Sequence, residues 1–156
     1  MLYPVVVVLV LAVPHSFTGT VVALHDGDTV TVLDGKTQVK VRLNAIDAPE
    51  RKQAFGTKSK DALAVRIFGK TVTVLWNEHD RYGRTLGHVM LDGQWINKWM
   101  VQEGWAWHYK QYSHDKRLAR WEDESRAAKK GLWSDPHPEA PWVFRHKAKP
   151  AKKRAA

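Results

Sequence analysis

The chain contains no cysteine among its 156 residues. Disulfide bonds, zinc sites built on thiolates and cysteine nucleophiles are therefore excluded. Eight histidines are present, but they are scattered along the chain without the spacing of a metal-binding motif. No histidine is therefore singled out for a catalytic or metal-binding role.

The chain also lacks an apolar run long enough to cross a bilayer. Its longest apolar stretch, residues 2–13, reads LYPVVVVLVLAV, whereas a membrane-spanning helix needs about 20 apolar residues. The stretch matches the apolar core of a signal peptide, so we expect residues 1–16 to be a signal peptide and the protein to be secreted or periplasmic. No Lys or Arg precedes the stretch, and no small-x-small cleavage site follows it. The alternatives are a buried β-strand and an uncleaved membrane anchor, although we expect no stable membrane partner.

Acidic residues are fewer than basic ones, with 16 Asp and Glu against 25 Lys and Arg, and the net charge is +9. Six of the basic residues lie between Arg145 and Arg154, where no acidic residue occurs, and removing them leaves a net charge of +3. Segment 141–156 is therefore expected to be a basic, disordered tail, either simply solvated or a weak tether for polyanions. A basic balance suits nucleic acid as a partner, because each phosphate contact releases counterions.

Residues 17–140 have the pattern of one mainly β domain with helices, an α+β fold. Strands are expected at 18–24, 29–33, 38–43, 71–76 and 85–91, and helices at 58–67, 95–103 and 115–130. Five short strands with a helix before the fourth predict a five-stranded barrel of the oligonucleotide-binding type. The eight tryptophans are expected mainly to pack in and around the core, with base stacking as the alternative for one or two.

Two aspartates lie where such a barrel gathers its loops. Asp28 follows the turn Asp26-Gly27, and Asp47 follows the third expected strand. If the two carboxylates converge within ~5 Å, they repel by roughly 3 kcal/mol at an effective dielectric near ~20, and a hard cation would relieve that repulsion. Oxygen ligands favour calcium or magnesium over zinc or copper. Taken singly, each aspartate is more typical of a turn former.

Two arginines and a glutamate lie near these aspartates in the expected fold. Arg42 alternates with a Val/Leu stripe, so it points away from the core, and Arg84 stands at the entrance of the fifth strand. Two guanidinium groups beside a metal could clamp a phosphate and stabilise transition-state charge. Glu50 lies three residues after Asp47, within reach of a water beside the same metal. Each residue alone is more often a solvated side chain or a helix-start carboxylate.

Four motifs occur in a fixed order along the chain. They read DGDTV at 26–30, VRL at 41–43, IDAPE at 46–50 and DRYGR at 80–84. Together they resemble the staphylococcal (micrococcal) nuclease family, also called thermonuclease. VQEGWA at 101–106 and GLWS at 131–134 extend the resemblance over residues 17–134.

The resemblance implies an oligonucleotide-binding barrel with three helices. It implies calcium-dependent hydrolysis of DNA and RNA, single-stranded or locally opened, to products with 3′-phosphates. In this family, residues at the positions of Asp28 and Asp47 bind Ca²⁺, with the backbone carbonyl of residue 48 as a third ligand. Those at the positions of Arg42 and Arg84 contact the scissile phosphate, and the one at Glu50 activates or orients the attacking water.

The resemblance also implies a nucleotide site lined by Tyr82 and by Tyr109 or Tyr112. This chain departs from the family prototype at Ala48, where the prototype has Thr. A backbone carbonyl survives that change, so calcium binding should persist while a hydroxyl contact is lost. Arg51 likewise replaces a small polar residue.

A different class of function is a non-catalytic module that binds single-stranded nucleic acid, because oligonucleotide-binding barrels often hold strands without cutting them. A degenerate member of the family would lose one of five residues. All five are present in this chain: Asp28, Arg42, Asp47, Glu50 and Arg84. The resemblance, with all five residues kept, therefore favours a calcium-dependent endonuclease over the binding module. We also expect the protein to be a monomer.

Overall fold

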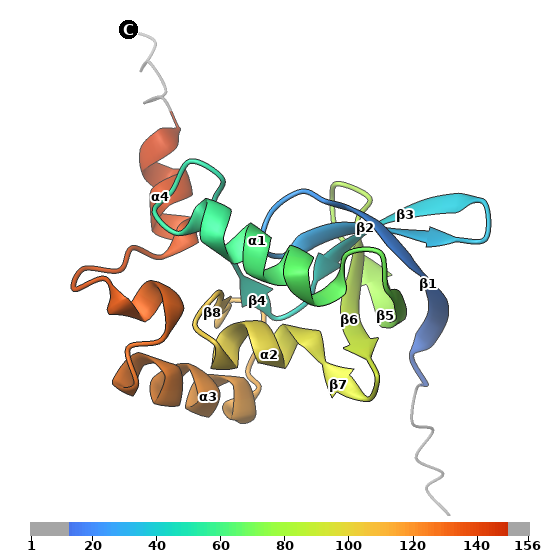
Figure 1. Cartoon of the computed structure of the whole chain (residues 1–156). Helices are drawn as coiled ribbons and strands as arrows, with labels where there is room; N and C mark the ends of the chain where they lie inside the picture. The colour runs from blue at the N-terminus through green and yellow to red at the C-terminus, as the bar shows by residue number, and fades with distance from the viewer. Residues whose placement is uncertain (1–12, 150–156) are drawn as a thin grey trace, which may run out of the picture.

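A computed structural model describes residues 13–149 of the protein. Its main feature is a barrel of five long strands with helices gathered around one side (Figure 1). The strands are β1 (His15–Leu24), β2 (Thr29–Asp34), β3 (Thr37–Leu43), β5 (Thr71–His79) and β6 (Thr85–Leu91). They confirm the five strands and the oligonucleotide-binding barrel predicted from the sequence.

The barrel closes because β3 pairs with two strands. The antiparallel order is β3-β2-β1-β5-β6, and β3 also pairs with β6 in parallel, with Val41 opposite Thr85 and Arg42 opposite Leu86. Gly87 permits this closure, since an added Cβ would lie only 2.7 Å from a methyl of Val74 and 2.9 Å from a methyl of Val41. A larger residue at this position would have to displace these side chains of the neighbouring strands β3 and β5.

Alternating apolar residues fill the barrel. Along β3, Val41 and Leu43 are fully buried whereas Lys40 and Arg42 are not, so Arg42 lies on the face opposite the core, as the alternation predicts. The same alternation on β6 buries Thr85, Gly87, Val89 and Leu91. Arg84 directly precedes β6 and is two residues from Leu86, so the register places it on the outer face that Arg42 shares.

Three helices and three two-residue strands complete the predicted fold. Helix α1 (Gly56–Ile67) lies between the third and fourth long strands, and α2 (Ile96–Gln102) packs on α3 (Lys116–Ala127). Strand β4 (Ile46–Asp47) pairs with β8 (Trp107–His108), and β7 (Gln94–Trp95) extends the sheet beside β6. The β4–β8 pair connects the barrel to the chain segment before α3.

The C-terminal region differs from the sequence prediction. A 3-10 turn (Gly131–Ser134) is followed by a fourth helix, α4 (Pro141–Ala148), where the sequence predicts the start of a disordered tail. Pro141 stands in the first turn of α4, where its missing N–H has no helical partner to lose. Figure 1 shows α4 beside the loop that follows β4, away from the β2–β3 hairpin. The basic segment therefore begins with an ordered helix.

The two ends of the chain carry predictions that lie outside the described residues. Residues 1–12, most of the predicted signal peptide, and residues 150–156, the end of the predicted tail, are not described. Strand β1 begins at His15, within the range assigned to the signal peptide. Within residues 13–149, no helix has both the length and the apolar character to cross a membrane.

Candidate active site

Asp28 is positioned by a tight turn between β1 and β2. Its backbone N–H donates to Asp26 Oδ1 at 3.0 Å, and the turn rests on α1, where a Cβ at Gly27 would collide with Ser59 Oγ. The Asp28 carboxylate is almost fully buried and accepts from the N–H of Ala48 at 2.7 Å and from the hydroxyl of Thr29 at 3.0 Å. The loop around β4 and the β1–β2 turn are thus joined through this carboxylate.

Asp47 approaches Asp28 from the short strand β4. The pairing of Asp47 with Trp107 of β8 fixes its backbone, and its side chain is 1% exposed. One nitrogen of Arg42, Nη2, lies 3.2 Å from Asp28 Oδ2 and 3.1 Å from Asp47 Oδ1. The two carboxylates predicted to bind a cation therefore converge on a single point.

Arg42 is itself held firmly in place. Its Nη1 donates to the carbonyls of Leu43 at 2.7 Å and Ile46 at 2.8 Å, while Nη2 contacts the two aspartates. With 12% of its side chain exposed, Arg42 is a largely buried cation that contacts both carboxylates. This arrangement stabilises the loop between β3 and β4 as well as the site.

Burial raises the pKa of both Asp28 and Asp47. Desolvation raises the pKa of Asp28 to about 7, against the opposing effect of Arg42. Desolvation is also the main reason that the pKa of Asp47 is raised to about 6, while hydrogen bonds from Arg145 act in the opposite direction. Both shifts indicate that the nearby guanidinium groups only partly compensate for the removal of these carboxylates from water.

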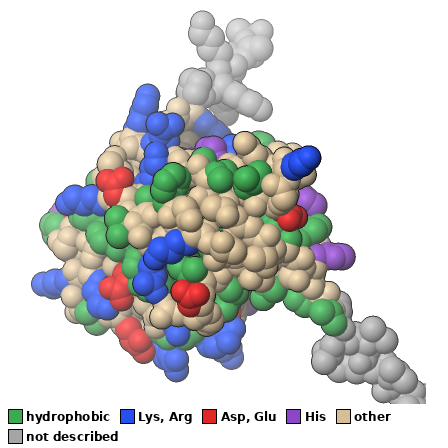
Figure 2. Space-filling view, turned by 45° about the vertical axis from the view of Figure 1, so that its right-hand side comes forward, with side chains coloured by type: hydrophobic (Ala, Val, Ile, Leu, Met, Phe, Trp, Pro, Cys, Tyr) green, Lys and Arg blue, Asp and Glu red, His purple; other side chains and the backbone are tan. Residues whose placement is uncertain are grey.

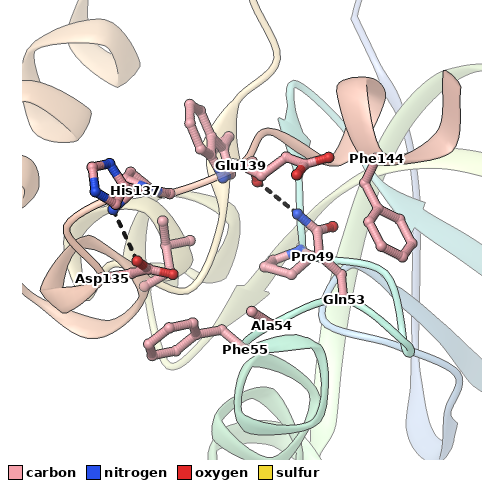
Figure 3. A pocket seen from close by; sticks show the side chains of 11 residues that line it. Pro49, Gln53, Ala54, Phe55, Asp135, His137, Glu139 and Phe144 are labelled. Atoms are coloured by element: carbon pink, nitrogen blue, oxygen red, sulfur yellow. Dashed lines mark hydrogen bonds between the residues drawn. The ribbon is translucent and has the colours of Figure 1, made fainter. Parts of the chain in front are cut away.

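Glu50 lies in the loop between β4 and α1 and is more exposed than the aspartates, at 34%. Gln53 fixes this loop through two hydrogen bonds. Its Oε1 accepts from the Glu50 N–H at 3.0 Å, and its Nε2 donates to the Glu139 carbonyl at 2.6 Å. The second bond ties the loop to the segment that leads into α4. It runs along a cavity of about 200 Å³ between Pro49, Phe55 and Phe144 (Figure 3).

A third arginine, Arg145 of α4, enters the site from the C-terminal region. Its Nη1 and Nη2 donate to Asp47 Oδ1 at 3.1 Å and Oδ2 at 2.8 Å, and Nη1 also donates to Glu50 Oε1 at 2.8 Å. These bonds raise the pKa of Arg145 above its ordinary value, although burial works against that increase. The sequence pattern assigned Arg145 to the basic tail and gave no sign of this role.

Arg84 is oriented by Asp80 rather than by the cluster of carboxylates. Asp80 Oδ2 accepts from Arg84 Nε at 2.6 Å, and Oδ1 accepts from the Arg84 N–H at 3.0 Å. These hydrogen bonds lower the pKa of Asp80 despite its partial burial. Within residues 13–149, Arg84 makes no hydrogen bond to Asp28, Asp47 or Glu50, so its predicted partner is the substrate.

The three predicted substrate-binding tyrosines have different environments. Tyr82 is 68% exposed beside Arg84, whose guanidinium lies 5.4 Å from the ring centre. Tyr112 is 69% exposed. Tyr109 is stacked on Trp142 of α4, with ring centres 5.4 Å apart, and its hydroxyl lies 3.4 Å from Arg145 Nη2. Tyr82 and Tyr112 are thus exposed enough to stack on a base, whereas one face of Tyr109 is covered.

The site residues that the sequence did not reveal share a physical cause. Gln53 bonds to Glu139, 86 residues away, and Arg145 bonds to Asp47, 98 residues away. Trp142 packs on Trp107 and Tyr109, which are also distant in the sequence. A local pattern of residues contains no signal for such contacts. A weak signal existed in Pro141-Trp142, since a proline followed by an aromatic residue is an unusual start for a disordered tail.

Basic side chains do not form one broad patch on the visible face of the molecule. Figure 2 shows Lys and Arg distributed around that face, with acidic side chains between several of them. Among residues 13–149, no group of three or more His, Asp or Glu side chains is arranged to hold a metal ion.

Comparisons with known proteins agree with the motifs. The family model described as "Staphylococcal nuclease homologue" matches residues 40–135. A "Micrococcal nuclease" of Shigella flexneri is 44% identical over 158 residues, covering 93% of this chain and 91% of that protein. An "Uncharacterized endonuclease" of Escherichia coli O157:H7 is 48% identical, covering 83% of this chain and 85% of that protein. Another, of Haemophilus influenzae, is 45% identical, covering 85% of this chain and 75% of that protein.

Proposed function

Since the chain belongs to the staphylococcal nuclease family, we propose that it is a calcium-dependent endonuclease that hydrolyses DNA and RNA to products with 3′-phosphates. The observation that carries this proposal is the convergence of two buried carboxylates, Asp28 and Asp47, on one nitrogen of Arg42, with Glu50 beside them. A non-catalytic binding module has no need for two carboxylates that are costly to bury.

The donor groups suit a hard divalent cation. Asp28 and Asp47 supply oxygen atoms, and no thiolate exists in the chain. Their raised pKa values indicate carboxylates that lack sufficient compensating positive charge. Asp28 and Asp47 would hold the cation, with the Ala48 carbonyl as the proposed third ligand. When bound, the cation neutralises these carboxylates and polarises the phosphoryl group to be attacked.

Glu50 is the residue proposed to orient the attacking water. It is more accessible than either aspartate, and the Gln53 hydrogen bond to its backbone fixes the position of the loop beside the site. A carboxylate in this position can accept a proton from water or align it for in-line attack. Arg145 contacts one oxygen of the same carboxylate, Oε1.

Arg84 is proposed to stabilise charge on the scissile phosphate. Asp80 holds its Nε and backbone N–H, and the two terminal nitrogens of its guanidinium make no hydrogen bond within residues 13–149. A guanidinium prepared in this way loses little entropy when it binds a phosphate. Exposed Tyr82 beside it supplies a surface on which a neighbouring base can stack.

The test is the chemical identity of the products. Short DNA and RNA oligonucleotides are incubated with the protein and calcium, and the fragments are weighed by mass spectrometry. We expect internal cleavage of both, with the phosphate retained on the 3′ end of each 5′ fragment. Fragments ending in 3′-hydroxyl groups would contradict the proposed bond specificity, and bound but intact oligonucleotides would support the binding module.

We also propose that the protein is exported, which rests on the apolar residues 2–13 and on their length. The measurement is the N-terminal mass of protein recovered from periplasm or medium. We expect cleavage near residues 14–18. Recovery of a protein that still begins at Met1 in a membrane fraction would support an uncleaved anchor instead.

A further inference from the structure

Arg145 occupies the part of the site that a cation and a phosphate need. Its planar fork covers both oxygens of Asp47 and one oxygen of Glu50, with three donor–acceptor distances between 2.8 and 3.1 Å. A divalent cation bound to Asp47 competes for the same oxygens, because a guanidinium and a cation cannot occupy one position. In this arrangement the guanidinium of Arg145 covers the carboxylates of the site.

Helix α4 does not depend on Arg145 for its position. Trp142 stacks on Tyr109 at an interplanar angle of 3° and meets Trp107 edge-on, while the residue before the helix, Ala140, is buried. Gln53 holds the carbonyl of Glu139 at 2.6 Å, as Figure 3 shows. The helix can therefore stay docked while the long Arg145 side chain, which is 36% exposed, changes its partner.

A phosphate is the natural second partner for this side chain. Carboxylate and phosphate both present paired oxygens that match the two parallel N–H bonds of a guanidinium. When a cation binds Asp47, the half-buried guanidinium of Arg145 loses its two hydrogen bonds to that carboxylate. The scissile phosphate, drawn to the same cation, then brings new oxygens within its reach.

We propose that Arg145 is a third phosphate-binding arginine of this enzyme, which neutralises Asp47 and Glu50 until the cation enters and then transfers its fork to the substrate phosphate. This inference rests on the proposed nuclease function and adds to it a residue and an order of events. It makes Arg145 a competitor of the cation and a partner of the phosphate. A residue that only stabilised the metal-free site would also compete with the cation, because it contacts both oxygens of Asp47, but it would not bind the phosphate.

The experiment measures two affinities by isothermal titration calorimetry in wild type, Arg145→Ala and Arg145→Lys. The first is the affinity for Ca²⁺ alone. The second, at saturating Ca²⁺, is the affinity for a deoxynucleoside 3′,5′-bisphosphate, which carries phosphates but no diester to cleave. Lys147→Ala is the matched control, because Lys147 is a cation of the same helix that pairs with Glu139 and does not contact the site. Circular dichroism verifies that each variant is folded.

We expect Arg145→Ala to bind Ca²⁺ about fivefold or more tightly and the bisphosphate about tenfold more weakly, a range typical of coupling between ligands. Arg145→Lys should give intermediate values in both titrations, and Lys147→Ala should match wild type. Weaker or unchanged calcium binding by folded Arg145→Ala, or unchanged bisphosphate binding, would overturn the proposal. If wild type and Arg145→Ala both fail to bind Ca²⁺, the proposed calcium dependence falls as well, so the two failures are distinguishable.

Discussion

At the scale of single residues, the buried carboxylate of Asp28 makes the stability of the folded protein depend on pH. Burial raises its pKa to about 7, from 3.8 for an exposed aspartate. Between these two values the folded protein holds a proton that the unfolded chain has lost. The contribution of Asp28 to stability is therefore fully present below about pH 4 and is lost as the pH rises through about 7. Without a cation, the ionised carboxylate destabilises the folded protein at pH 8.

We accordingly expect Asp28→Asn to raise the melting temperature of the metal-free protein by a few degrees at pH 8, and by less at pH 5. The amide keeps an oxygen for the Ala48 N–H but carries no charge to desolvate. The same variant should lose the stabilisation that calcium gives wild type. Thermal unfolding at both pH values, with chelator and with calcium, measures these effects.

The control for Asp28→Asn is Asp61→Asn, which removes an exposed carboxylate on α1. It should change neither the pH dependence nor the response to calcium. A lower melting temperature for Asp28→Asn at pH 8 in chelator would show that the buried charge is well compensated, and the proposed cost of burying Asp28 would be wrong.

Arg84→Ala should reduce the cleavage rate by at least about a hundredfold while leaving the fold intact, because an arginine that stabilises transferring phosphoryl charge contributes about 10³–10⁵ in rate in other enzymes. Among residues 13–149, the Arg84 side chain donates a hydrogen bond to Asp80 and lies over the ring of Tyr82, so its loss removes little packing. Initial rates on a fluorogenic oligonucleotide measure the effect. Arg120→Ala, on the exposed face of α3, serves as control, and equal rates for Arg84→Ala and wild type would refute the role.

The local part of the site was predictable from the sequence, and the long-range part was not. Strand alternation correctly placed Arg42 on the outer face of β3, and turn chemistry placed Asp28 at a loop. The bonds of Arg42 to two carbonyls could not be read from the pattern, because they depend on the path of the loop to Ile46. Arg145 could not be placed at all, since composition alone assigned it to a solvated tail.

At the scale of elements, α3 supports the site through a buried carboxylate. Glu122 is fully buried, and its Oε2 accepts from the His108 N–H at 2.7 Å. Its Oε1 accepts from Lys110 at 3.1 Å and from Arg126 at 3.2 Å. Through these bonds α3 holds β8, and β8 in turn pairs with Asp47. The helix is therefore connected to the site through one strand.

Glu122→Ala should lower the free energy of unfolding by about 2–4 kcal/mol, because it leaves the His108 N–H without its buried acceptor and two cations without their partner. Urea unfolding followed by fluorescence gives the difference. Glu124→Ala, which removes an exposed ion pair with Arg120 on the same helix, should change stability by no more than about 0.5 kcal/mol. Equal losses in the two variants would contradict the buried role of Glu122.

Local sequence specified the helices and strands of the barrel domain but not the C-terminal helix α4. The sequence predicted α1 and α3 and all five barrel strands from turn residues and periodicity, with ends displaced by a few residues. It did not predict α4, because this helix is anchored by Trp142. Trp142 packs on Tyr109 and Trp107, which lie far from it in the sequence and so leave no local pattern. Basic composition suggested solvation, whereas aromatic contacts and the bond from Gln53 order the segment.

At the scale of the whole molecule, the barrel gathers residues from distant parts of the chain. The end of β3 and helix α4 each contribute an arginine within hydrogen-bond distance of Asp47 in β4, and Arg42 of β3 also contacts Asp28 in the β1–β2 turn. The parallel β3–β6 pairing adds Arg84 on the adjoining outer face. The sequence motifs include Asp28, Arg42 and Asp47, and the closed barrel explains how these three residues meet.

Digestion of plasmid DNA tests most directly whether the protein is a cation-dependent nuclease whose cation binds at Asp28 and Asp47. Purified wild type and Asp28→Asn are each incubated with plasmid in calcium, and in parallel with an excess of chelator. We predict complete degradation by wild type in calcium, intact plasmid in chelator, and intact plasmid with Asp28→Asn in both. Degradation by wild type in chelator, or by Asp28→Asn in calcium at the wild-type rate, would contradict the proposed cation site.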